Sequence, residues 1–359
     1  MSRKLPLRRA RGAPRWVAPT ALLAIVLLWL GRLPAQGVAT QERPLAVVDL
    51  HADLPYQHVY RGVDFASGSG QYAAEELLRA GVVGVVLPLF IPHRVHARGP
   101  RLADLEHSYR SVFDALTRTP PYALPGCLAP AGRVRTWLAF EGAAPLAADP
   151  EALTAWVARG VRSVGLVHTA DNALASSSGE RKPSAEGLHP RGRELVRKAH
   201  QLGVAVDVSH ASDRALADVL ALAREDHVPV IATHSNARSL AGHPRNLSDE
   251  QLRGIAATGG VVGVNFHGPF LRRGGRATLA DVVDHVRHLV KVMGSAHVAI
   301  GSDFEGGIAP PPELSDIQGF QRLARALQQA GLPRATVAQI YSTNALRILC
   351  RGEAERAAP

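Results

Sequence analysis

The sequence predicts an α/β fold, a (β/α)8 barrel of the TIM type with extra C-terminal helices. Three observations support this. Eight short apolar segments recur between residues 46 and 303, helix-like segments separate them, and histidines and carboxylates cluster where the apolar segments end. Continuous runs of Val, Ile and Leu are typical of parallel strands that are buried on both faces. Eight βα units in succession favour a barrel, with a doubly wound open sheet as the alternative.

The predicted elements alternate along the chain. The strands are Ala46–Asp53, Val82–Phe90, Thr136–Glu141, Ser163–His168, Val204–His210, Val228–His234, Gly260–Phe266 and His297–Asp303. The helices cover residues 72–80, 102–117, 149–159, 190–202, 213–225, 249–257 and 279–293. Two further helices, at 316–330 and 334–349, follow the eighth unit and are separated by Pro333. Residues 41–350 are therefore expected to form one domain.

The composition allows a large core without requiring disulfides. The chain has 359 residues, 46% of them hydrophobic, which suits one barrel. Its two cysteines, Cys127 and Cys350, form no Cys-x-x-Cys pair, which excludes thiolate zinc sites. They could pair if the protein is exported, but the sequence does not place them within bridging distance.

The positive charge is concentrated at the N-terminus. The net charge is +10, and residues 1–32 carry seven basic residues and no acidic one, so 10 minus 7 leaves about +3 on the rest. This distribution argues against a nucleic-acid-binding surface. The 15 residues Trp16–Leu30 are apolar and uncharged. Residues 1–40 are thus predicted to be an export signal or an N-terminal membrane anchor, which implies a periplasmic, cell-envelope or secreted protein. Residues 351–359 are expected to form a disordered tail.

The polar residues that end the predicted strands are the main functional signal. They are His51, Asp53, Glu141, His168, His210, His234 and Asp303. A single histidine at a strand end is usually a hydrogen-bonded loop residue, but in a barrel all these ends converge on one face. Carboxylates gathered there would repel one another unless a cation neutralises them. Histidines and carboxylates without thiolates suit zinc.

The number of candidate ligands exceeds what one catalytic zinc needs, which is three protein ligands and a water. Two ions that share a bridging carboxylate fit better, and such a pair activates a hydroxide for hydrolysis. Arg245, in the loop Gly242–Asn246, has the planar guanidinium that suits a substrate carboxylate. The basic loop between His93 and Arg101 would lie over the same face.

Several stretches resemble the membrane (renal) dipeptidase family, peptidase family M19 of the amidohydrolase-like metal-dependent barrels. These stretches are Asp49–Pro55, Glu141-Gly142, Gly203–His210, Pro229–Arg238, His243–Asn246, Ala257–Phe266, His297–Phe304 and Asn344–Arg347. The resemblance covers residues 46–350, and the run from 229 to 266 is the most specific part. The chain departs from the family pattern at Gly142-Ala143-Ala144 and in the loop 169–188, which bears on substrate choice.

The resemblance implies a binuclear zinc site. His51, Asp53 and the bridging Glu141 would hold one zinc ion, and Glu141, His210 and His234 would hold the second. Arg245 would bind the free carboxylate of the substrate. His168 would contact the substrate and stabilise the tetrahedral intermediate, and Asp303 would carry the proton from the bridging water to the leaving amine.

The expected activity is zinc-dependent hydrolysis of dipeptides, including those with a C-terminal D-residue. A related binuclear hydrolase acting on a lactam, a lactone or an N-acyl amino acid is the alternative, which the loops 57–72, 93–101 and 169–188 would decide. A non-catalytic metal- or peptide-binding protein of the envelope is a third reading. The expected partner is a dipeptide substrate and not nucleic acid. Membrane association through the N-terminal segment and a homodimer are both compatible with the sequence.

Overall fold

The computed structural model describes residues 43–92, 95, 99–181 and 185–351. The predicted export signal or anchor at 1–40 lies outside these residues, as does the predicted tail except for Arg351. Most of the basic loop between His93 and Arg101 also lies outside them. Within the described ranges, no helix has the length and apolar character needed to cross a bilayer.

Eight parallel strands form a closed barrel, which confirms the predicted fold. The strands of the sheet are β1 (Val47–Asp49), β2 (Val82–Phe90), β3 (Tyr122–Pro125), β4 (Val134–Glu141), β5 (Val161–Gly165), β6 (Ala205–Asp207), β7 (Val230–Ala232), β8 (Val261–Val264) and β9 (Val298–Ile300). Their order is β2-β1-β9-β8-β7-β6-β5-β4-β3, and pairing of β2 with β4 closes the ring. Strand β3 is additional to the predicted eight, and it pairs with the first residues of β4.

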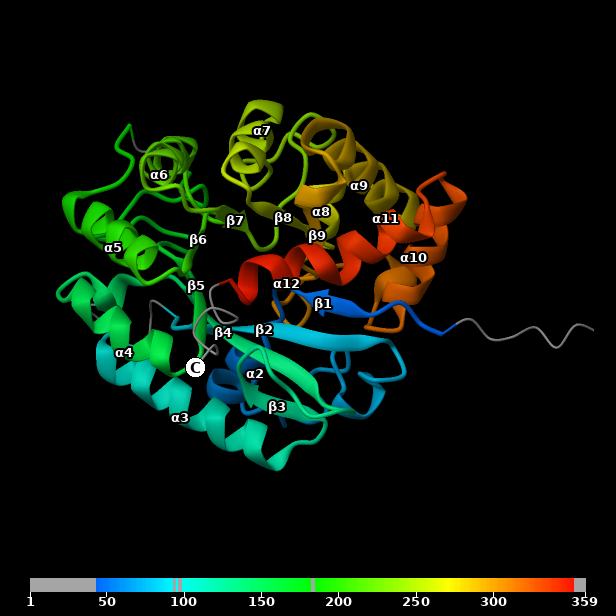
Figure 1. Ribbon diagram of the computed structural model, residues 1–359, viewed down its shortest axis with the longest axis horizontal. Coiled ribbons are helices and arrows are strands. Elements are labelled where there is room, and N and C mark those ends of the chain that lie inside the picture. The colour runs from blue at the N-terminus through cyan, green and yellow to red at the C-terminus, as the bar shows by residue number, and fades with distance from the viewer. Residues whose placement is uncertain (1–42, 93–94, 96–98, 182–184, 352–359) are drawn as a thin grey trace, which may run out of the picture. The chain divides into compact units, whose positions relative to one another are not determined.

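Helices surround the strands (Figure 1). They are α2 (Leu54–Arg61), α3 (Leu102–Arg118), α4 (Leu153–Ala158), α5 (Pro190–Gln201), α6 (Asp213–Asp226), α7 (Asp249–Ala257), α8 (Gly268–Leu271), α9 (Leu279–Met293), α10 (Gly319–Gln329), α11 (Arg334–Ala338) and α12 (Asn344–Leu349). The local sequence determines where several of these helices start. Helix α7, for example, begins with a capping box in which Ser248 and Gln251 each accept from the other's backbone N–H.

Three local predictions are corrected by the structure. The helix expected at 72–80 is only a 3-10 turn at Ala74–Glu76. The helix expected at 334–349 contains a π-helical segment, Gln339–Thr343, between α11 and α12. The first strand ends at Asp49 and not at Asp53, and helix α2, which was not predicted, starts at Leu54 with Pro55 in its first turn. Proline is well tolerated there, because the backbone N–H groups of the first helical turn have no partner within the helix.

Helix α12 covers the N-terminal end of the barrel. Its residues Ala345, Ile348 and Leu349 join the apolar cluster of inward-facing strand residues that includes Val48 and Trp137. Asn344 ties the helix to β9 because its Nδ2 donates to the carbonyl oxygen of Val298 at 2.8 Å. The carboxyl ends of the strands lie at the opposite end of the barrel.

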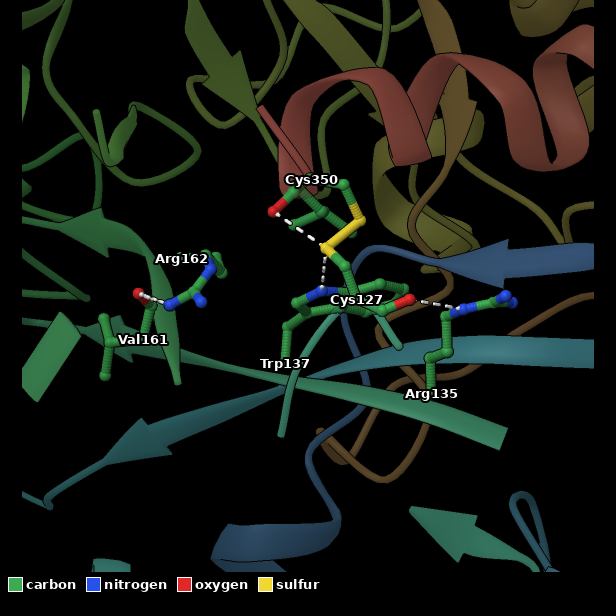
Figure 2. Close-up of a disulfide and its surroundings, with 7 residues drawn as sticks. Cys127, Arg135, Trp137, Val161, Arg162 and Cys350 are labelled. Atoms are coloured by element: carbon green, nitrogen blue, oxygen red, sulfur yellow. Dashed lines mark hydrogen bonds between the residues drawn. A yellow bond between two sulfur atoms is a disulfide. The ribbon is translucent and has the colours of Figure 1, made fainter. Parts of the chain in front are cut away.

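A disulfide between Cys127 and Cys350 fastens this helix to the loop after β3 (Figure 2). The two Cα atoms lie 5.7 Å apart, and the bond links residues 223 positions apart in sequence. Trp137 Nε1 donates to Cys127 Sγ at 3.3 Å, and Arg135 Nε donates to the Cys127 carbonyl at 2.9 Å. The pairing that the sequence left open is therefore present in the structure.

The ends of β7, β8 and β9 approach one another closely. A methyl group on Gly263 or Gly301 would lie 2.0 Å or 1.7 Å from the carbonyl oxygen of Thr233. Only glycine allows backbones to pass this closely. The backbone of Thr233, which follows β7, is thereby held in one position at the base of the site described next.

Candidate metal centre

The strand-end residues predicted from the sequence gather at the carboxyl ends of the barrel strands. Glu141 is the last residue of β4, whereas the other six lie in the loops that follow their strands. All five predicted metal ligands are at most 8% exposed. Asp303, after β9, has a φ of 65°, a left-handed conformation that is uncommon outside glycine and is often found at functional sites.

The carboxylate of Glu141 is the centre of this cluster. Its Oε1 lies 3.4 Å from His51 Nε2, 3.0 Å from His210 Nε2 and 3.6 Å from His234 Nε2. The Nε2 atoms of His210 and His234 are themselves 3.0 Å apart. One carboxylate oxygen therefore faces histidines from three different strand ends.

Two further acidic residues, Asp53 and Asp303, belong to the cluster. Asp53 Oδ2 lies 3.7 Å from His51 Nε2, so His51, Asp53 and Glu141 form a set whose ligand atoms all lie within 4.8 Å. Asp303 belongs to a second such set with His51 and His234. Glu141, His168 and His210 make a third.

His168 and Arg245 border the cluster. The ring of His168 lies between the rings of Phe90 and His210, with centroid distances of 4.3 Å to each. Its Nε2 is 3.9 Å from Glu141 Oε1. Arg245 Nη2 lies 3.2 Å from His210 Nε2, and its guanidinium lies 5.5 Å from the Phe270 ring centroid. Arg245 Nη1 is buried and makes no hydrogen bond to any residue that the structure describes.

Burial makes charge in this cluster unfavourable when no cation is bound. It raises the pKa of Asp53 and of Glu141 well above the usual range, and neighbouring carboxylates add to the shift. It raises the pKa of Asp303 to about 6 and lowers that of His51 to about 3. The pKa values of His210 and His234 are lowered by the same burial. The imidazoles are thus kept neutral, the form that binds metal, and the carboxylates need a cation to be ionised together.

The geometry fits divalent metal ions. Tetrahedral zinc with ligand bonds of 2.0–2.2 Å separates its ligand atoms by about 3.3–3.6 Å. The distances from Glu141 Oε1 to the Nε2 atoms of His51, His210 and His234 are 3.0–3.6 Å, and His51 Nε2 lies 3.7 Å from Asp53 Oδ2. His51 Nε2 is buried and lacks a hydrogen bond within the described part of the chain, although it faces two carboxylates. A metal ion would satisfy this atom.

Polar residues beneath the ligands, which the sequence analysis did not single out, hold them in place. Asp49 accepts hydrogen bonds from the backbone N–H and the hydroxyl of Ser302, at 2.8 and 2.6 Å. Asp207 accepts from Ser209 and Thr233. Asn265 donates to Asp303. One pattern could have revealed the two aspartates. Each ends its strand, and each precedes a candidate histidine by two or three residues in Asp49-Leu50-His51 and Asp207-Val208-Ser209-His210.

Comparison with known proteins agrees with this geometry. The family model described as membrane dipeptidase (peptidase family M19) matches residues 39–358. The chain belongs to the membrane dipeptidase family. Members of this family are metallo-dipeptidases, hydrolases that act on peptide bonds. The resemblance inferred from the sequence is therefore confirmed.

Two solved membrane dipeptidase structures resemble the chain over most of its length. Dipeptidase AC, a metallopeptidase of family M19, is 26% identical, with a TM-score of 0.75 over 86% of this chain and 98% of its own. A metallopeptidase from Rhodobacter sphaeroides, solved with a phosphinate mimic of the dipeptide L-Ala-D-Ala, is 25% identical. Its TM-score is also 0.75, over 86% of this chain and 99% of its own.

Relatives by sequence match a shorter stretch. A protein from the pqqA 5′ region of Klebsiella pneumoniae is 39% identical over 218 residues, which are 58% of this chain and 79% of that protein. The dipeptidase C3A11.10c of Schizosaccharomyces pombe is 33% identical over 217 residues, 60% of this chain. That match spans about half, 52%, of the yeast protein.

Proposed function

We propose that this membrane dipeptidase homologue hydrolyses dipeptides, including those with a C-terminal D-residue, and that it uses two zinc ions. When bound, the ions would supply a bridging hydroxide as the nucleophile. The observation that carries the proposal is the position of Glu141 Oε1, which lies within 3.6 Å of the Nε2 atoms of His51, His210 and His234.

In this proposal the ligands divide into two sets. His51, Asp53 and Glu141 hold one ion, and Glu141, His210 and His234 hold the other. The short distances within each set support the division, because no two ligand atoms in the second set are more than 3.6 Å apart. Imidazole and carboxylate ligands without thiolates favour zinc over softer or harder metals.

Arg245 supplies recognition of short substrates. Arg245 as a whole is 7% exposed, and its buried Nη1 has no hydrogen-bond partner among the described residues. A free substrate carboxylate would satisfy this atom and form a paired charge-assisted contact. The Rhodobacter sphaeroides relative, solved with a mimic of L-Ala-D-Ala, supports inclusion of substrates with a D-residue at the second position.

Asp303 and His168 have complementary roles. Asp303 takes the proton released by the attacking water and returns it to the leaving amine, a role supported by its place within 4.8 Å of the ligand atoms of His51 and His234. His168 contacts the substrate and stabilises the oxyanion of the tetrahedral intermediate. Its position beside Glu141, with a half-buried ring between Phe90 and His210, supports this role.

A metal-depletion experiment tests the proposal. The protein is treated with a chelator and assayed on a panel of L,L- and L,D-dipeptides before and after zinc is restored. Loss of hydrolysis on depletion and recovery with two zinc equivalents per chain is the expected result. Full activity in the metal-free protein would contradict the zinc proposal. Activity only on lactams, lactones or N-acyl amino acids would instead identify the protein as a related binuclear hydrolase.

Export to the periplasm, cell envelope or exterior is part of the same proposal, either with cleavage of the N-terminal segment or with that segment retained as an anchor. The disulfide between Cys127 and Cys350 supports an oxidising compartment. Fractionation of cells, with mass spectrometry of the mature N-terminus, tests it. A reduced protein found only in the cytosol would contradict it.

A homodimer is proposed on the family resemblance and is tested by sedimentation.

A further inference from the structure

The hydroxyl of Thr233 is surrounded by four side chains at the base of the metal centre. Its Oγ1 lies 2.5 Å from Asp207 Oδ2, 2.9 Å from His234 Nδ1 and 3.3 Å from His51 Nδ1. Ser209 Oγ lies 3.2 Å from the same atom. Thr233 is 1% exposed, so water does not compete for these contacts. The histidines belong to different ions in the proposed division of ligands.

A count of protons decides the direction of each hydrogen bond. A threonine hydroxyl has one proton to donate and two lone pairs to accept. A carboxylate only accepts, and a separation of 2.5 Å is typical of a hydroxyl that donates to one. Ser209 Oγ donates its one proton to the other oxygen of Asp207 at 2.6 Å, a shorter contact than its 3.2 Å to Thr233 Oγ1, so it does not use a lone pair of Thr233. The single proton of Thr233 is therefore used on Asp207.

The two lone pairs of Thr233 Oγ1 then accept from the histidines. His234 and His51 must each carry their proton on Nδ1, because the hydroxyl has no second proton to give either nitrogen. A neutral imidazole with a proton on Nδ1 has its free lone pair on Nε2. In both residues Nε2 is the atom that faces Glu141 Oε1, at 3.4 Å for His51 and 3.6 Å for His234.

We propose that Thr233 is a shared positioning residue, whose hydroxyl fixes the Nδ1–H tautomer of both His51 and His234 and so presents one Nε2 lone pair to each metal ion. The proposal rests on the proposed binuclear site. Its physical basis is the general role of outer hydrogen bonds in setting the tautomer and orientation of metal-binding histidines.

The groups around Thr233 hold its hydroxyl in a fixed position. The Thr233 backbone N–H donates to Asp207 Oδ1 at 3.1 Å, so main chain and side chain are held by the same carboxylate. Gly263 and Gly301 crowd its carbonyl oxygen on the other side. The centroids of the His51 and His234 rings lie 3.9 Å apart, and both rings contact Thr233 Oγ1.

Thr233→Val tests the proposal, because it removes the hydroxyl and keeps the shape of the side chain. Thr136→Val is a matched control, since Thr136 is equally buried and its hydroxyl makes one hydrogen bond, to the Ala123 carbonyl away from the site. Zinc affinity is measured for each equivalent by competition with a chromophoric chelator, and thermal stability is measured in parallel.

The expected result is a loss of about 10- to 100-fold in affinity for both zinc ions in Thr233→Val. Thr233→Ser should bind zinc like the wild type, and Thr136→Val should lose stability while keeping both affinities. Unchanged affinities in Thr233→Val would overturn the proposal. Weakening of only one ion would overturn the shared role.

A measurement on the metal-free wild type keeps the proposal testable if Thr233→Val does not fold. Two-bond ¹H–¹⁵N spectra of protein with labelled histidine report the tautomer of each ring. The expected spectra show protons on Nδ1 of both His51 and His234, and a proton on Nε2 of either ring would overturn the assignment. If the wild type shows these tautomers but binds no zinc, the proposed function fails and the tautomer assignment stands.

Discussion

Asn265 Nδ2 donates a hydrogen bond of 2.9 Å to Asp303 Oδ2, across the ends of the neighbouring strands β8 and β9. The side-chain amide of Asn265 cannot rotate freely, because its Oδ1 accepts a hydrogen bond from the backbone N–H of His267. This contact favours the ionised form of Asp303, whereas burial favours the protonated form and raises its pKa to about 6. The balance sets the pH at which Asp303 can accept a proton.

Asn265→Ala should move the acidic limb of the activity profile to higher pH. Removing the donor raises the pKa of Asp303 further, and Asp303 acts as a base only above its pKa. Bound cations would lower this pKa in both proteins, so the direction of the change is preserved. The measurement is kcat/KM against pH for wild type and variant. An acidic limb at the same pH would mean that another group titrates.

Asp303→Asn should lower kcat by about 100- to 10,000-fold, because the amide cannot carry the proton. Zinc content should stay at the wild-type level, and elemental analysis of the purified variant measures it. Asp303 also lies within ligand distance of His51 and His234. Loss of zinc from the variant would therefore identify Asp303 as a metal ligand and not as a proton carrier.

His51→Ala and Asp53→Ala should each release one zinc ion selectively. In the proposed division both residues belong to the set without His210 and His234, and each supplies one of only three protein ligands to that ion. Zinc retained after dialysis should fall toward one equivalent per chain, with His210 and His234 still occupied. Retention of two equivalents, or loss of both in either variant, would contradict the division.

Arg245→Met should weaken binding of substrates through their free carboxylate. A hydrogen bond to a charged group contributes about 1.5–3 kcal/mol, which corresponds to about 10- to 150-fold in kcat/KM. For each protein, kcat/KM is compared between a dipeptide and the same dipeptide with a C-terminal amide. The wild type should prefer the free acid, and the variant should lose most of that preference. An unchanged preference would place carboxylate recognition elsewhere.

Replacing both Cys127 and Cys350 by Ser should lower stability without changing the active site. Loss of a native disulfide typically costs about 2–5 kcal/mol, and this one closes a long loop. Because it lies at the end of the barrel away from Glu141, kcat and zinc content at low temperature should match the wild type. Thermal unfolding measures the loss of stability. A loss of zinc would indicate that the two ends of the barrel are coupled.

The sequence was sufficient to predict the barrel and its strand-end residues, because buried parallel strands read as apolar runs and their polar ends stand out. It did not reveal Thr233 as a site residue, since a threonine beside a histidine is chemically ordinary until Asp207 and His51 are brought to it by folding. Strand β3 was missed because Tyr122–Pro125 has only 4 residues and ends in proline, which is uncommon inside a strand. The disulfide depended on a Cα–Cα distance of 5.7 Å that only the folded chain sets.

Helix α12 has a consequence for biosynthesis. Ala345, Ile348 and Leu349 complete the apolar cluster inside the barrel, and Cys350 then fastens the helix to Cys127. The apolar core at this end of the barrel is therefore completely packed only after residues 344–350 have been synthesised and have docked.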